Sequence, residues 1–504
     1  MMPILSANLS NGRKGNMEQV LSTSMLENKL ALRQLFGQSV DFYTKDVTLA
    51  GVSCCICMFE GLSSIERLWI MMLDVASKLE KETFTPQQLY EYLLCQTAIP
   101  METKTVSSIS EAQIYLTAGT TVFLIDGAAR GLVISTQSMQ FRSVSEPSGE
   151  GNLKGSREGF IELLRINISL LRRLLRNDSF RVETMTAGQT TKTEIALCYD
   201  KNLCPAQLLR YTRSQLEQLD IPVLLDSAYL VPFLGRRGFR FFSGAGCTER
   251  PDRAAAKICE GKIVILVNGS PFALILPWLF YENFQSMDDY STKAYFASFI
   301  RLLKYAAFFL AVLLPGIFVL AAGYTPELFP PEMLYKIASA EKSTPLPLFL
   351  EMILANFLLE IIREAGLRLP KPIGHSVSLV AALIIGDAAV NAGLLGTPVI
   401  IVAALTTICT FVVPSLYEPV TVLRILFILS GGLLGPIGMA ALFFVMLLDI
   451  SGLNCFGIPY LTPLAPFQSN AWRDVLLRVG WRRLSKHPFS IRKFQPKGEQ
   501  EDAT

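Results

Sequence analysis

The chain has 504 residues, of which 51% are hydrophobic and only 18% are charged, and its mean hydropathy is +0.37. Soluble globular proteins carry about 25% charged residues, so the composition excludes a wholly soluble protein, and it equally excludes a largely disordered one. The net charge of +3 is too balanced for a nucleic-acid-binding protein recognised by its charge. Only two histidines, His375 and His487, are present, which leaves little scope for histidine catalysis or histidine-ligated metals.

The first half of the chain is polar. Residues 1–36 are predicted to form a polar tail with a short helix from about Met17. Because no apolar stretch follows the first residue, this start does not resemble a secretory signal, and we expect the polar half to lie in the cytoplasm. Ten cysteines without paired CxxC motifs suit that reducing compartment. Cys54, Cys55 and Cys57 are better explained by a buried strand than by a metal site.

Residues 37–142 and 181–290 are predicted to be two copies of one α/β unit. The segments 121–134 and 263–276 each contain two apolar strands around an Asp-Gly or Asn-Gly turn, which is typical of a β-hairpin. A matching strand precedes each hairpin, and a helix follows each of these strands. The strands are 53–62 and 194–203, and the helices are 64–79 and 205–219. The offset is about 141 residues at both places, which indicates a duplication.

Residues 143–180, between the copies, hold a Gly- and Ser-bearing linker and a basic amphipathic helix predicted over 157–176. The arginines of this helix either bind acidic lipid or an acidic partner, or they form the solvated side of a helix that packs on its own domain. They are Arg165, Arg172, Arg173 and Arg176. We take Arg172 and Arg173 as candidates for a domain interface or for coupling between domains.

Residues 291–470 are predicted to form an all-α membrane domain. Four stretches are apolar enough to span a bilayer, which needs about 20 residues. They lie at about 300–323, 376–394, 398–415 and 424–448. The tail 471–504 is rich in lysine and arginine, which indicates a cytoplasmic C-terminus. Two cytoplasmic ends require an even number of crossings, and four crossings satisfy this.

A fifth apolar segment, 345–369, carries charges and is predicted not to span. Glu360, Arg363 and Glu364 follow i, i+3, i+4 spacing and therefore share one helix face. Such a helix is costly in lipid, so it should lie at the interface or, as we favour, face a water-filled cavity within a protein bundle. The expected fold class is α+β/α: a duplicated cytoplasmic α/β domain, then a helical transmembrane domain of about four spans plus one amphipathic non-spanning helix.

An ordered set of motifs runs from about residue 40 to residue 470. They are SVSEP and REGF in 143–160, TERPD (248–252), EGKIVILVNGSP (260–271), DDY (288–290), LEIIREAGLRLP (ending at Pro370), ALIIGDAAVNAG (382–393) and FGIPYLTPLAP (456–466). In this order the set resembles the A subunit of GerA-type spore germination receptors. Stage V sporulation AF-type proteins share the general architecture, and the chain resembles them less.

The resemblance implies a non-enzymatic integral membrane protein of the spore inner membrane. Its expected partners are a transporter-like membrane subunit that binds nutrient germinants and a germination lipoprotein, beside membrane lipid. The family is thought to oligomerise through this subunit into an ion-conducting channel. The family usually has Gln where this chain has Asp387, so ion preference cannot be carried over.

The charged segment 345–369 supplies the main candidates for a pore or gate. A ring of several copies of Glu351, Asn356 and Glu360 would favour cations. Alternatively, Glu360, Arg363 and Glu364 pair with one another and hold the bundle together. Asp387, inside an apolar span, is either functional or hydrogen-bonded to a neighbouring span, with Asn391 one turn further on.

The motif 248–252 precedes a helical run, which Thr248 or Asp252 would cap. Arg250 is expected to pair with a carboxylate across domains or subunits, so Arg250 and Asp252 are further coupling candidates. No nucleophile and base accompany them, and we predict neither catalysis nor a cofactor. Three hypotheses stay open: a germinant-gated channel subunit, a non-conducting scaffold or AF-type accessory protein, and, least favoured, a membrane enzyme or transporter acting alone.

Overall fold

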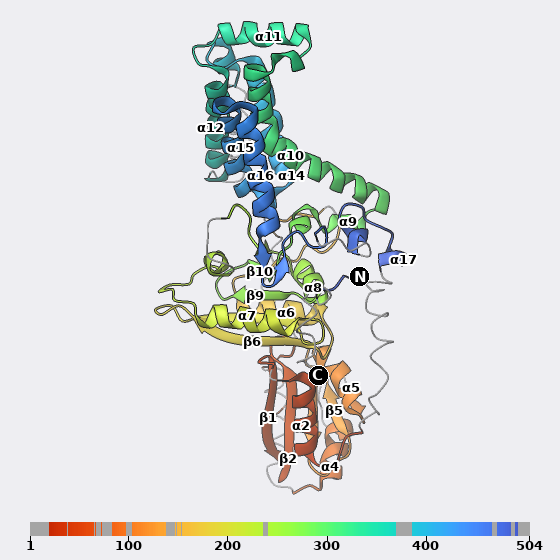
Figure 1. The fold of residues 1–504 in the computed structure, drawn as a ribbon. Helices are drawn as coiled ribbons and strands as arrows, with labels where there is room; N and C mark the ends of the chain where they lie inside the picture. The colour runs from red at the N-terminus through yellow and green to blue at the C-terminus, as the bar shows by residue number, and fades with distance from the viewer. Residues whose placement is uncertain are drawn as a thin grey trace.

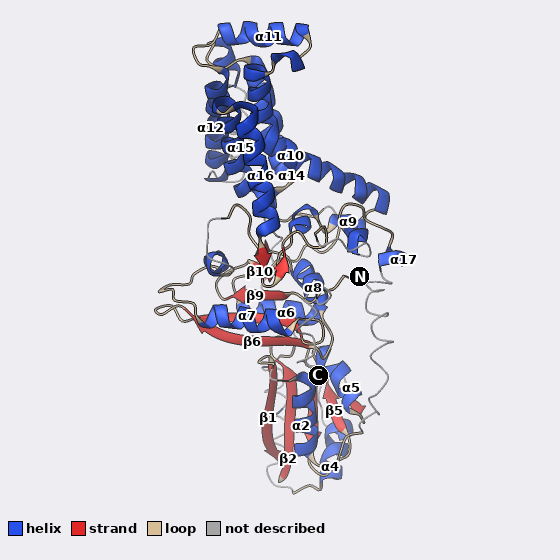
Figure 2. Cartoon of the chain, viewed as in Figure 1, coloured by secondary structure: helices blue, strands red, loops and turns tan. Residues whose placement is uncertain are grey.

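The computed structural model describes residues 20–37, 39–64, 66, 72, 83–96, 103–137, 147, 149–152, 154–234, 240–368, 386–465, 471–484 and 489–491. The chain is elongated, with a helical bundle at one end and two sheet-containing units in line below it (Figures 1 and 2). The second unit lies between the bundle and the first unit. The order along the molecule is therefore first unit, second unit, bundle.

The first unit is a five-stranded antiparallel sheet with helices on it. Its elements are α2 (Met25–Phe36), β1 (Phe42–Leu49), β2 (Val52–Phe59), α4 (Pro86–Glu91), η1 (Tyr92–Gln96), β3 (Thr103–Val106), α5 (Ile109–Thr117), β4 (Thr121–Ile125) and β5 (Gly131–Ile134). The strand order is β1-β2-β4-β5-β3. Separate apolar cores cover the two faces, and Leu32 and Phe36 of α2 belong to one of them.

The second unit repeats this arrangement. Its elements are α6 (Leu164–Leu174), β6 (Phe180–Ala187), β7 (Thr193–Asp200), α7 (Ala206–Glu217), η2 (Ser227–Phe233), β8 (Gly246–Thr248), α8 (Pro251–Cys259), β9 (Ile263–Val267), β10 (Ala273–Leu276) and η3 (Phe280–Phe284). The strand order β6-β7-β9-β10-β8 matches that of the first sheet position by position. Whether this likeness arose by duplication stays a prediction.

Both predicted hairpins are confirmed. Strands β4 and β5 pair antiparallel, as do β9 and β10. Gly127 and Gly269 take φ values of 86° and 93°, the left-handed backbone that a glycine after Asp or Asn supplies without steric cost. The predicted helix over 205–219 is α7, whereas the predicted helix over 64–79 lies almost wholly outside the described residues.

The basic helix predicted over 157–176 is shorter than expected. It is α6, which begins at Leu164 and ends at Leu174. The segment before the helix forms a loop that Asn167, within α6, holds closed. The Asn167 side-chain oxygen accepts a hydrogen bond from the backbone N of Ile161 at 2.9 Å, and its amide donates to the Ile161 carbonyl. These local bonds hold residues just upstream of the helix out of helical conformation.

The bundle and the tail follow the second unit. Their elements are α9 (Asp288–Ser291), α10 (Ala294–Tyr324), η4 (Pro326–Leu328), α11 (Pro331–Lys342), α12 (Leu348–Arg368), α14 (Thr397–Val412), η5 (Pro414–Leu416), α15 (Tyr417–Leu433), α16 (Gly435–Gly452), β11 (Asn454–Cys455), β12 (Ile458–Pro459), η6 (Ala471–Asp474) and α17 (Trp481–Leu484). Helix α11 crosses the far end of the bundle (Figure 1).

Three described helices are long and apolar enough to cross a membrane, judged by length and composition. They are Ala294–Tyr324, Pro414–Leu433 and Gly435–Gly452. The expected span 300–323 lies within the first of these. The expected span 398–415 is α14, which has only 16 residues. Most of the expected span 376–394 lies outside the described residues.

The expected single span 424–448 is wrong. Helix α15 ends there at Leu433, and a new helix, α16, begins at Gly435, whose φ is +64°. Gly435 supplies a left-handed turn that other residues rarely adopt, and Pro436 suits the first turn of a new helix. Two apolar helices therefore replace one, and α15 extends back to Tyr417.

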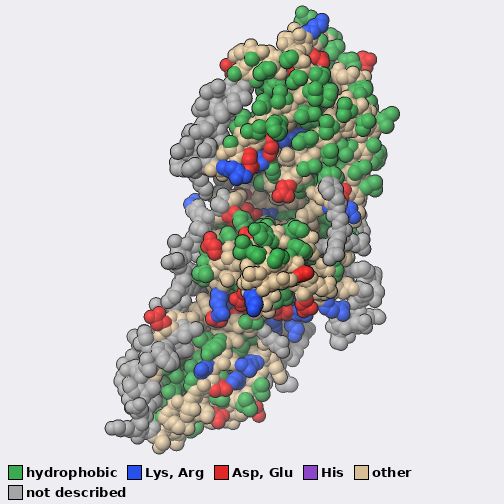
Figure 3. All heavy atoms as spheres, turned by 90° about the vertical axis from the view of Figure 1, so that its left-hand side faces the viewer, with side chains coloured by type: hydrophobic (Ala, Val, Ile, Leu, Met, Phe, Trp, Pro, Cys, Tyr) green, Lys and Arg blue, Asp and Glu red, His purple; other side chains and the backbone are tan. Residues whose placement is uncertain are grey.

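The bundle has an apolar outer surface and a tight inner seam. Figure 3 shows hydrophobic side chains over most of its visible face, and Ile437 on α16 is 84% exposed. Inside, α10 and α15 meet backbone to backbone. A Cβ added at Gly316 would lie 2.7 Å from the carbonyl oxygen of Phe427, and one added at Gly431 would lie 2.7 Å from that of Gly316.

Candidate functional site

Helix α12 packs within the bundle against α10, α14 and α15, so its charged side chains meet protein. Glu351, at its first turn, is 1% exposed. Its carboxylate accepts a hydrogen bond from the backbone N of Gly396 at 2.9 Å and another from the Thr344 hydroxyl. Gly396 is the residue before α14, where backbone N–H groups lack helical partners. Glu351 thus fastens the start of α14 to the start of α12.

Asn356 lies one turn further along α12 and is 4% exposed. Its amide donates to the carbonyl of Met352 at 2.8 Å, and its side-chain oxygen is buried without a hydrogen-bond partner. A buried acceptor left unpaired costs free energy and is uncommon in native proteins. Asn356 therefore offers an unused acceptor inside the bundle, whereas the Glu351 carboxylate is fully engaged.

A charged cluster lies between the C-terminal half of α12 and α15. We define it as Glu360 and Arg363 of α12 with Tyr417 and Arg424 of α15. Arg363 lies 2.6 Å from the Glu360 carboxylate, its guanidinium covers the Tyr417 ring at 3.9 Å, and the Tyr417 hydroxyl donates to Glu360. Figure 3 shows acidic and basic side chains together on this otherwise apolar bundle. The predicted pairing of Glu360 with Arg363 is present. Glu364 lies 3.7 Å from Arg363 and 2.7 Å from Arg368.

Arg424 is the least satisfied member of the charged cluster. It is 3% exposed on α15, and its nearest carboxylate oxygen, on Glu360, is 4.0 Å away. One nitrogen donates to the Thr410 hydroxyl at 3.4 Å, and its Nε has no partner. A buried cation with a distant counter-ion and an open donor is energetically costly, which makes it a candidate functional residue. Sequence reasoning missed it because residue 424 was placed at the edge of a span.

Asp387 and Asn391 lie on a short helical stretch, 386–391, and both side chains are exposed. They do not join Glu351, Asn356 or Glu360 in any hydrogen bond among the described residues. The structure thus separates the candidates into two engaged groups on α12 and one exposed pair. Their roles in a pore or gate stay predictions.

Arg172 joins the two α/β units. It is 1% exposed and makes a two-pronged ion pair with Asp41, at 2.8 and 2.9 Å. It also donates to the Ser39 hydroxyl and to the Phe180 carbonyl, and it lies between the rings of Phe59 and Phe180. A guanidinium in such a site cannot contact lipid. No local sequence pattern connects Arg172 with Asp41, because Asp41 lies 131 positions earlier in the chain.

The other predicted coupling residues stay within their own unit. Arg173 pairs with Glu158 just upstream of α6. Arg250 pairs with Asp252, two residues on, at 2.7 Å, so the expectation of a carboxylate from another domain or subunit is wrong. Arg250 also donates to the carbonyls of Glu150 and Ser156, and thereby fastens the linker to the start of α8.

The cap expected at this helix also differs. Arg250 is the residue before α8 and its own side chain does not cap the helix, but the Asp252 carboxylate accepts from the backbone N of Arg253 at 2.8 Å in the first turn. The Thr248 hydroxyl accepts from the Arg250 backbone N at 3.1 Å and therefore closes a turn ahead of the helix. Arg250 has an extended backbone at this position, and its long side chain reaches the carboxylate two residues on.

A set of buried ion pairs holds η3 to the rest of the second unit, and Phe280 and Phe284 of η3 pack in the core of the bundle. Glu282 is fully buried in η3 and contacts Lys257 at 2.5 Å and Lys262. Burial lowers the pKa of Lys262 to about 8, against a smaller opposing effect of Glu282. Burial also lowers the pKa of Lys257, but Glu260 and Glu282 outweigh it, so that the net pKa of Lys257 is raised. Two cations beside Glu282 lower its pKa despite the raising effect of burial.

No group of three or more His, Cys, Asp or Glu side chains in the described part of the chain has the geometry to hold a metal ion. Cys55 and Cys57 lie buried in β2, 3.9 Å apart at sulfur. The hydrogen bond between Cys57 and Cys55, together with burial, raises the pKa of Cys57, so it is an inert thiol at neutral pH. These features define a class: a membrane protein with a two-unit α/β domain followed by a bundle of apolar helices.

Comparison with known proteins gives the family. A family model described as "Bacillus/Clostridium GerA spore germination protein" matches residues 30–490. The chain belongs to the GerA family of spore germination proteins. It is 33% identical to spore germination protein KA of Bacillus subtilis (strain 168), over 94% of this chain and 88% of that protein.

Two further similarities complete the comparison. Stage V sporulation protein AF of Bacillus subtilis (strain 168) is 27% identical over 88% of this chain and 90% of that protein. The crystal structure of the N-terminal domain of the A subunit of the Bacillus megaterium spore germinant receptor GerK3 matches 53% of this chain and 99% of that chain. That match has a TM-score of 0.42 and 21% identity.

Proposed function

We propose that this chain is the A subunit of a nutrient germinant receptor, and that several copies form a germinant-gated ion channel in the spore inner membrane. The observation that carries the proposal is the family match over residues 30–490, which includes both α/β units and the bundle. Higher identity to spore germination protein KA than to stage V sporulation protein AF favours a receptor subunit over an accessory protein.

The charged cluster is the proposed gate. Carboxylates that face a shared axis attract cations and replace part of their hydration. In this structure Arg363 and Tyr417 engage the Glu360 carboxylate, and Arg424 approaches it. Conduction would require Glu360 to leave these partners. We infer that this structure corresponds to a closed state.

The α/β units are the proposed route by which a signal reaches this gate. The first and the last helix of the bundle both connect to the second unit. Helix α10 follows η3 in the chain, and Asp449, near the end of α16, accepts hydrogen bonds from Arg240 at 3.1 Å and from the backbone N of Phe241. We infer that the two units are duplicates, that both chain ends are cytoplasmic, and that a transporter-like germinant-binding subunit and a lipoprotein complete the receptor.

Deletion of the gene for this chain in its own spore-forming host distinguishes a receptor subunit from an accessory protein. A receptor subunit is needed only for the nutrients that its receptor recognises, so its loss should abolish germination with some nutrients and spare others. An accessory protein of the AF type should slow the response to every nutrient. Equal slowing with all nutrients would contradict the receptor proposal.

Charge-neutral variants test the gate. E360Q should change the rate of nutrient-triggered ion release from spores that contain normal amounts of the protein, and E351Q tests the other carboxylate. E341Q on the exposed end of α11 is the matched control. Normal release from both E351Q and E360Q spores would end the pore role of α12. Planar-bilayer recording of the purified protein, with and without its partner subunit, would separate a channel from a non-conducting scaffold.

A further inference from the structure

Helix α10 is longer than a bilayer crossing needs. Its 31 residues extend about 46 Å at 1.5 Å per residue, against a hydrocarbon core of about 30 Å. Helix α10 therefore exceeds a crossing by about ten residues, and its N-terminal end, which carries Arg301 and Lys304, is the end suited to the level of lipid headgroups. Figure 1 shows this part of α10 projecting away from the other bundle helices, above α9 and α17.

The projecting part of α10 has two different faces. Tyr295, Phe296 and Phe299 are exposed, at 73%, 48% and 61%. Aromatic side chains gather at membrane–water interfaces because one end of the ring system is apolar and the other tolerates water. The opposite face carries Arg301, which is fully buried against α9 and η6.

Two buried guanidinium groups meet under this helix with open donors. Arg301 donates to Asp289 at 2.7 Å and to Asp474 at 2.7 Å, and its third nitrogen, Nη2, has no partner. Arg478 is 4% exposed and donates through one nitrogen to the Thr292 carbonyl at 2.8 Å, while its Nε and Nη2 have none. Both guanidiniums lie against the Tyr290 ring, at 5.7 and 5.6 Å.

The carboxylates nearby do not satisfy Arg478. Asp474 accepts from Arg301 and from the Tyr290 hydroxyl at 2.6 Å, and Asp289 accepts from Arg301 and from the Ser286 hydroxyl. Burial lowers the pKa of Arg478, and the raising effect of Asp474 does not make up for it. Unpaired buried charged donors are costly, and an anion that approached them would remove that cost.

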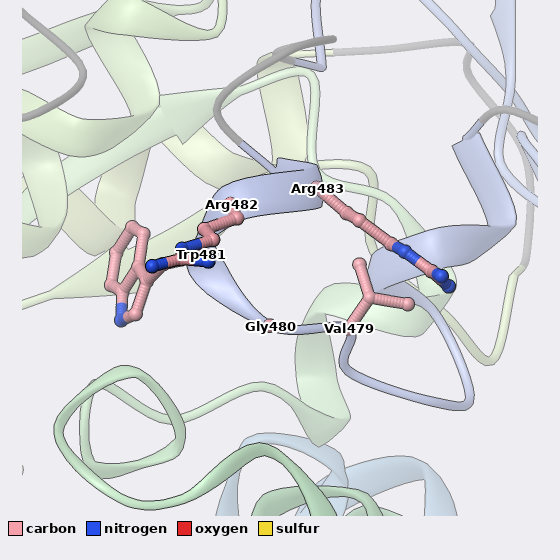
Figure 4. Close-up of a pocket in the computed structure, with 5 residues that line it drawn as sticks. All are labelled: Val479, Gly480, Trp481, Arg482 and Arg483. Atoms are coloured by element: carbon pink, nitrogen blue, oxygen red, sulfur yellow. The ribbon is translucent and has the colours of Figure 1, made fainter.

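A shallow groove is formed by the five residues that follow Arg478. Val479, Gly480, Trp481, Arg482 and Arg483 line it, and Figure 4 shows Trp481 and Arg483 extending to either side of the backbone turn. The Arg478 guanidinium lies 5.2 Å from the Trp481 ring centroid. Arg482 and Arg483 are exposed on α17. The groove is thus basic, carries a tryptophan, and lies beside a helix whose exposed face is aromatic.

We propose that the base of α10 binds the phosphate of an anionic phospholipid, with Arg478 and Arg301 as donors and with Trp481 and the exposed α10 aromatics in the lipid interface. Free inorganic phosphate shares the headgroup chemistry. The exposed aromatic residues at headgroup level favour lipid as its source. The proposal does not depend on channel activity.

Native mass spectrometry of the full chain, purified from vesicles of phosphatidylcholine and phosphatidylglycerol, tests the proposal. The wild type should retain phosphatidylglycerol, and R478Q should retain it about tenfold less tightly, the effect of losing one charge-assisted hydrogen bond. K336Q, which removes an exposed charge on α11 at the far end of the bundle, is the matched control and should behave as wild type. Equal retention by R478Q and wild type would overturn the proposal.

Further measurements cover the case in which R478Q does not fold, and they distinguish a lipid from free phosphate as the ligand. If R478Q fails to fold, the double variant R482Q/R483Q on exposed α17 should lower retention without touching the buried network, and unchanged retention there would count against the site. Inorganic phosphate added to lipid-free protein should not bind with comparable affinity. If it does, or if a label at F299C is shielded by protein rather than quenched by a lipid-borne quencher, a lipid site is excluded.

Discussion

The two α/β units have the same strand order but very different attachments. The first is joined to the second by one buried ion pair, Arg172 with Asp41, and otherwise by backbone hydrogen bonds and a surface ion pair, such as Val40 N to the Val182 carbonyl and Arg165 with Glu60. The second is joined to the bundle through several independent contacts: Glu282 with two lysines holds η3, whose phenylalanines pack in the bundle core, and Asp449 pairs with Arg240. One fold therefore serves two mechanical roles. The comparison predicts that Arg172, in the buried ion pair, contributes more than any other side chain to the joint between the units, whereas the joint to the bundle is spread over several contacts.

The largest expected effect is at Arg172. R172M leaves the buried Asp41 carboxylate without its counter-ion, which should cost about 3–5 kcal/mol of stability. R165Q is the matched control on the same helix, because Arg165 pairs with Glu60 at the surface and such pairs contribute about 0–1 kcal/mol. Thermal unfolding of the purified full chain gives both values. Equal losses in the two variants would break the comparison, and adding D41N to R172M should recover part of the loss.

The next largest loss of stability is expected where Glu351 joins the start of α12 to the start of α14. E351A leaves the Gly396 N–H buried and unpaired, which should cost about 1–3 kcal/mol. E341A, an exposed acidic residue on α11, should change the unfolding midpoint by little. The measurement is again thermal unfolding in detergent. A loss from E341A as large as that from E351A would show that charge, and not the bond to α14, matters.

The joint to the bundle should respond to pH. Burial lowers the pKa of Lys262 to about 8 in the folded state, while an unfolded lysine titrates near its usual value. Between these values the unfolded chain binds more protons, so the contribution of Lys262 to stability rises with pH. The wild type should gain about 1–2 kcal/mol over K262M between pH 8 and pH 9.5.

K257M is the control for that experiment, since the pKa of Lys257 is raised and Lys257 keeps its proton throughout this window. Because Lys257 also contributes to lowering the pKa of Lys262, the difference between K257M and the wild type should rise with pH, but less steeply than that of K262M. A slope with K257M as steep as that with K262M would show that another group titrates. Unfolding midpoints of the three proteins, measured side by side at each pH, decide the matter.

The smallest expected change in stability is at Arg424. Replacement of a poorly paired buried ion by an apolar residue of similar volume is often neutral or stabilising, so R424M should shift stability by no more than about 1 kcal/mol. If Arg424 belongs to the gate, ion release from R424M spores should nevertheless change. Unaltered release together with unaltered stability would remove Arg424 from the charged cluster as a functional residue.

Local signals predicted much of this fold, and long-range pairings escaped prediction. The Asp-Gly and Asn-Gly turns located both hairpins because a two-residue turn restricts its own backbone. The break at Gly435 was missed because a glycine within an uncharged run looks like one more apolar position. In the candidate site, Glu360 and Arg363 were found because i, i+3 spacing brings them together. Asp41 and Arg424 were not, because their partners come from other elements.

The contact between Gly316 and Gly431 limits how the bundle can rearrange. With two backbones in direct contact, no side chain at this seam can change rotamer to make room, and a turn of either helix about its axis would force larger residues into it. Helices α10 and α15 must therefore travel as a pair. In the proposed channel, a passage for ions would open more readily on the side of α12, where side chains such as Phe349, which packs against Gly432, can yield.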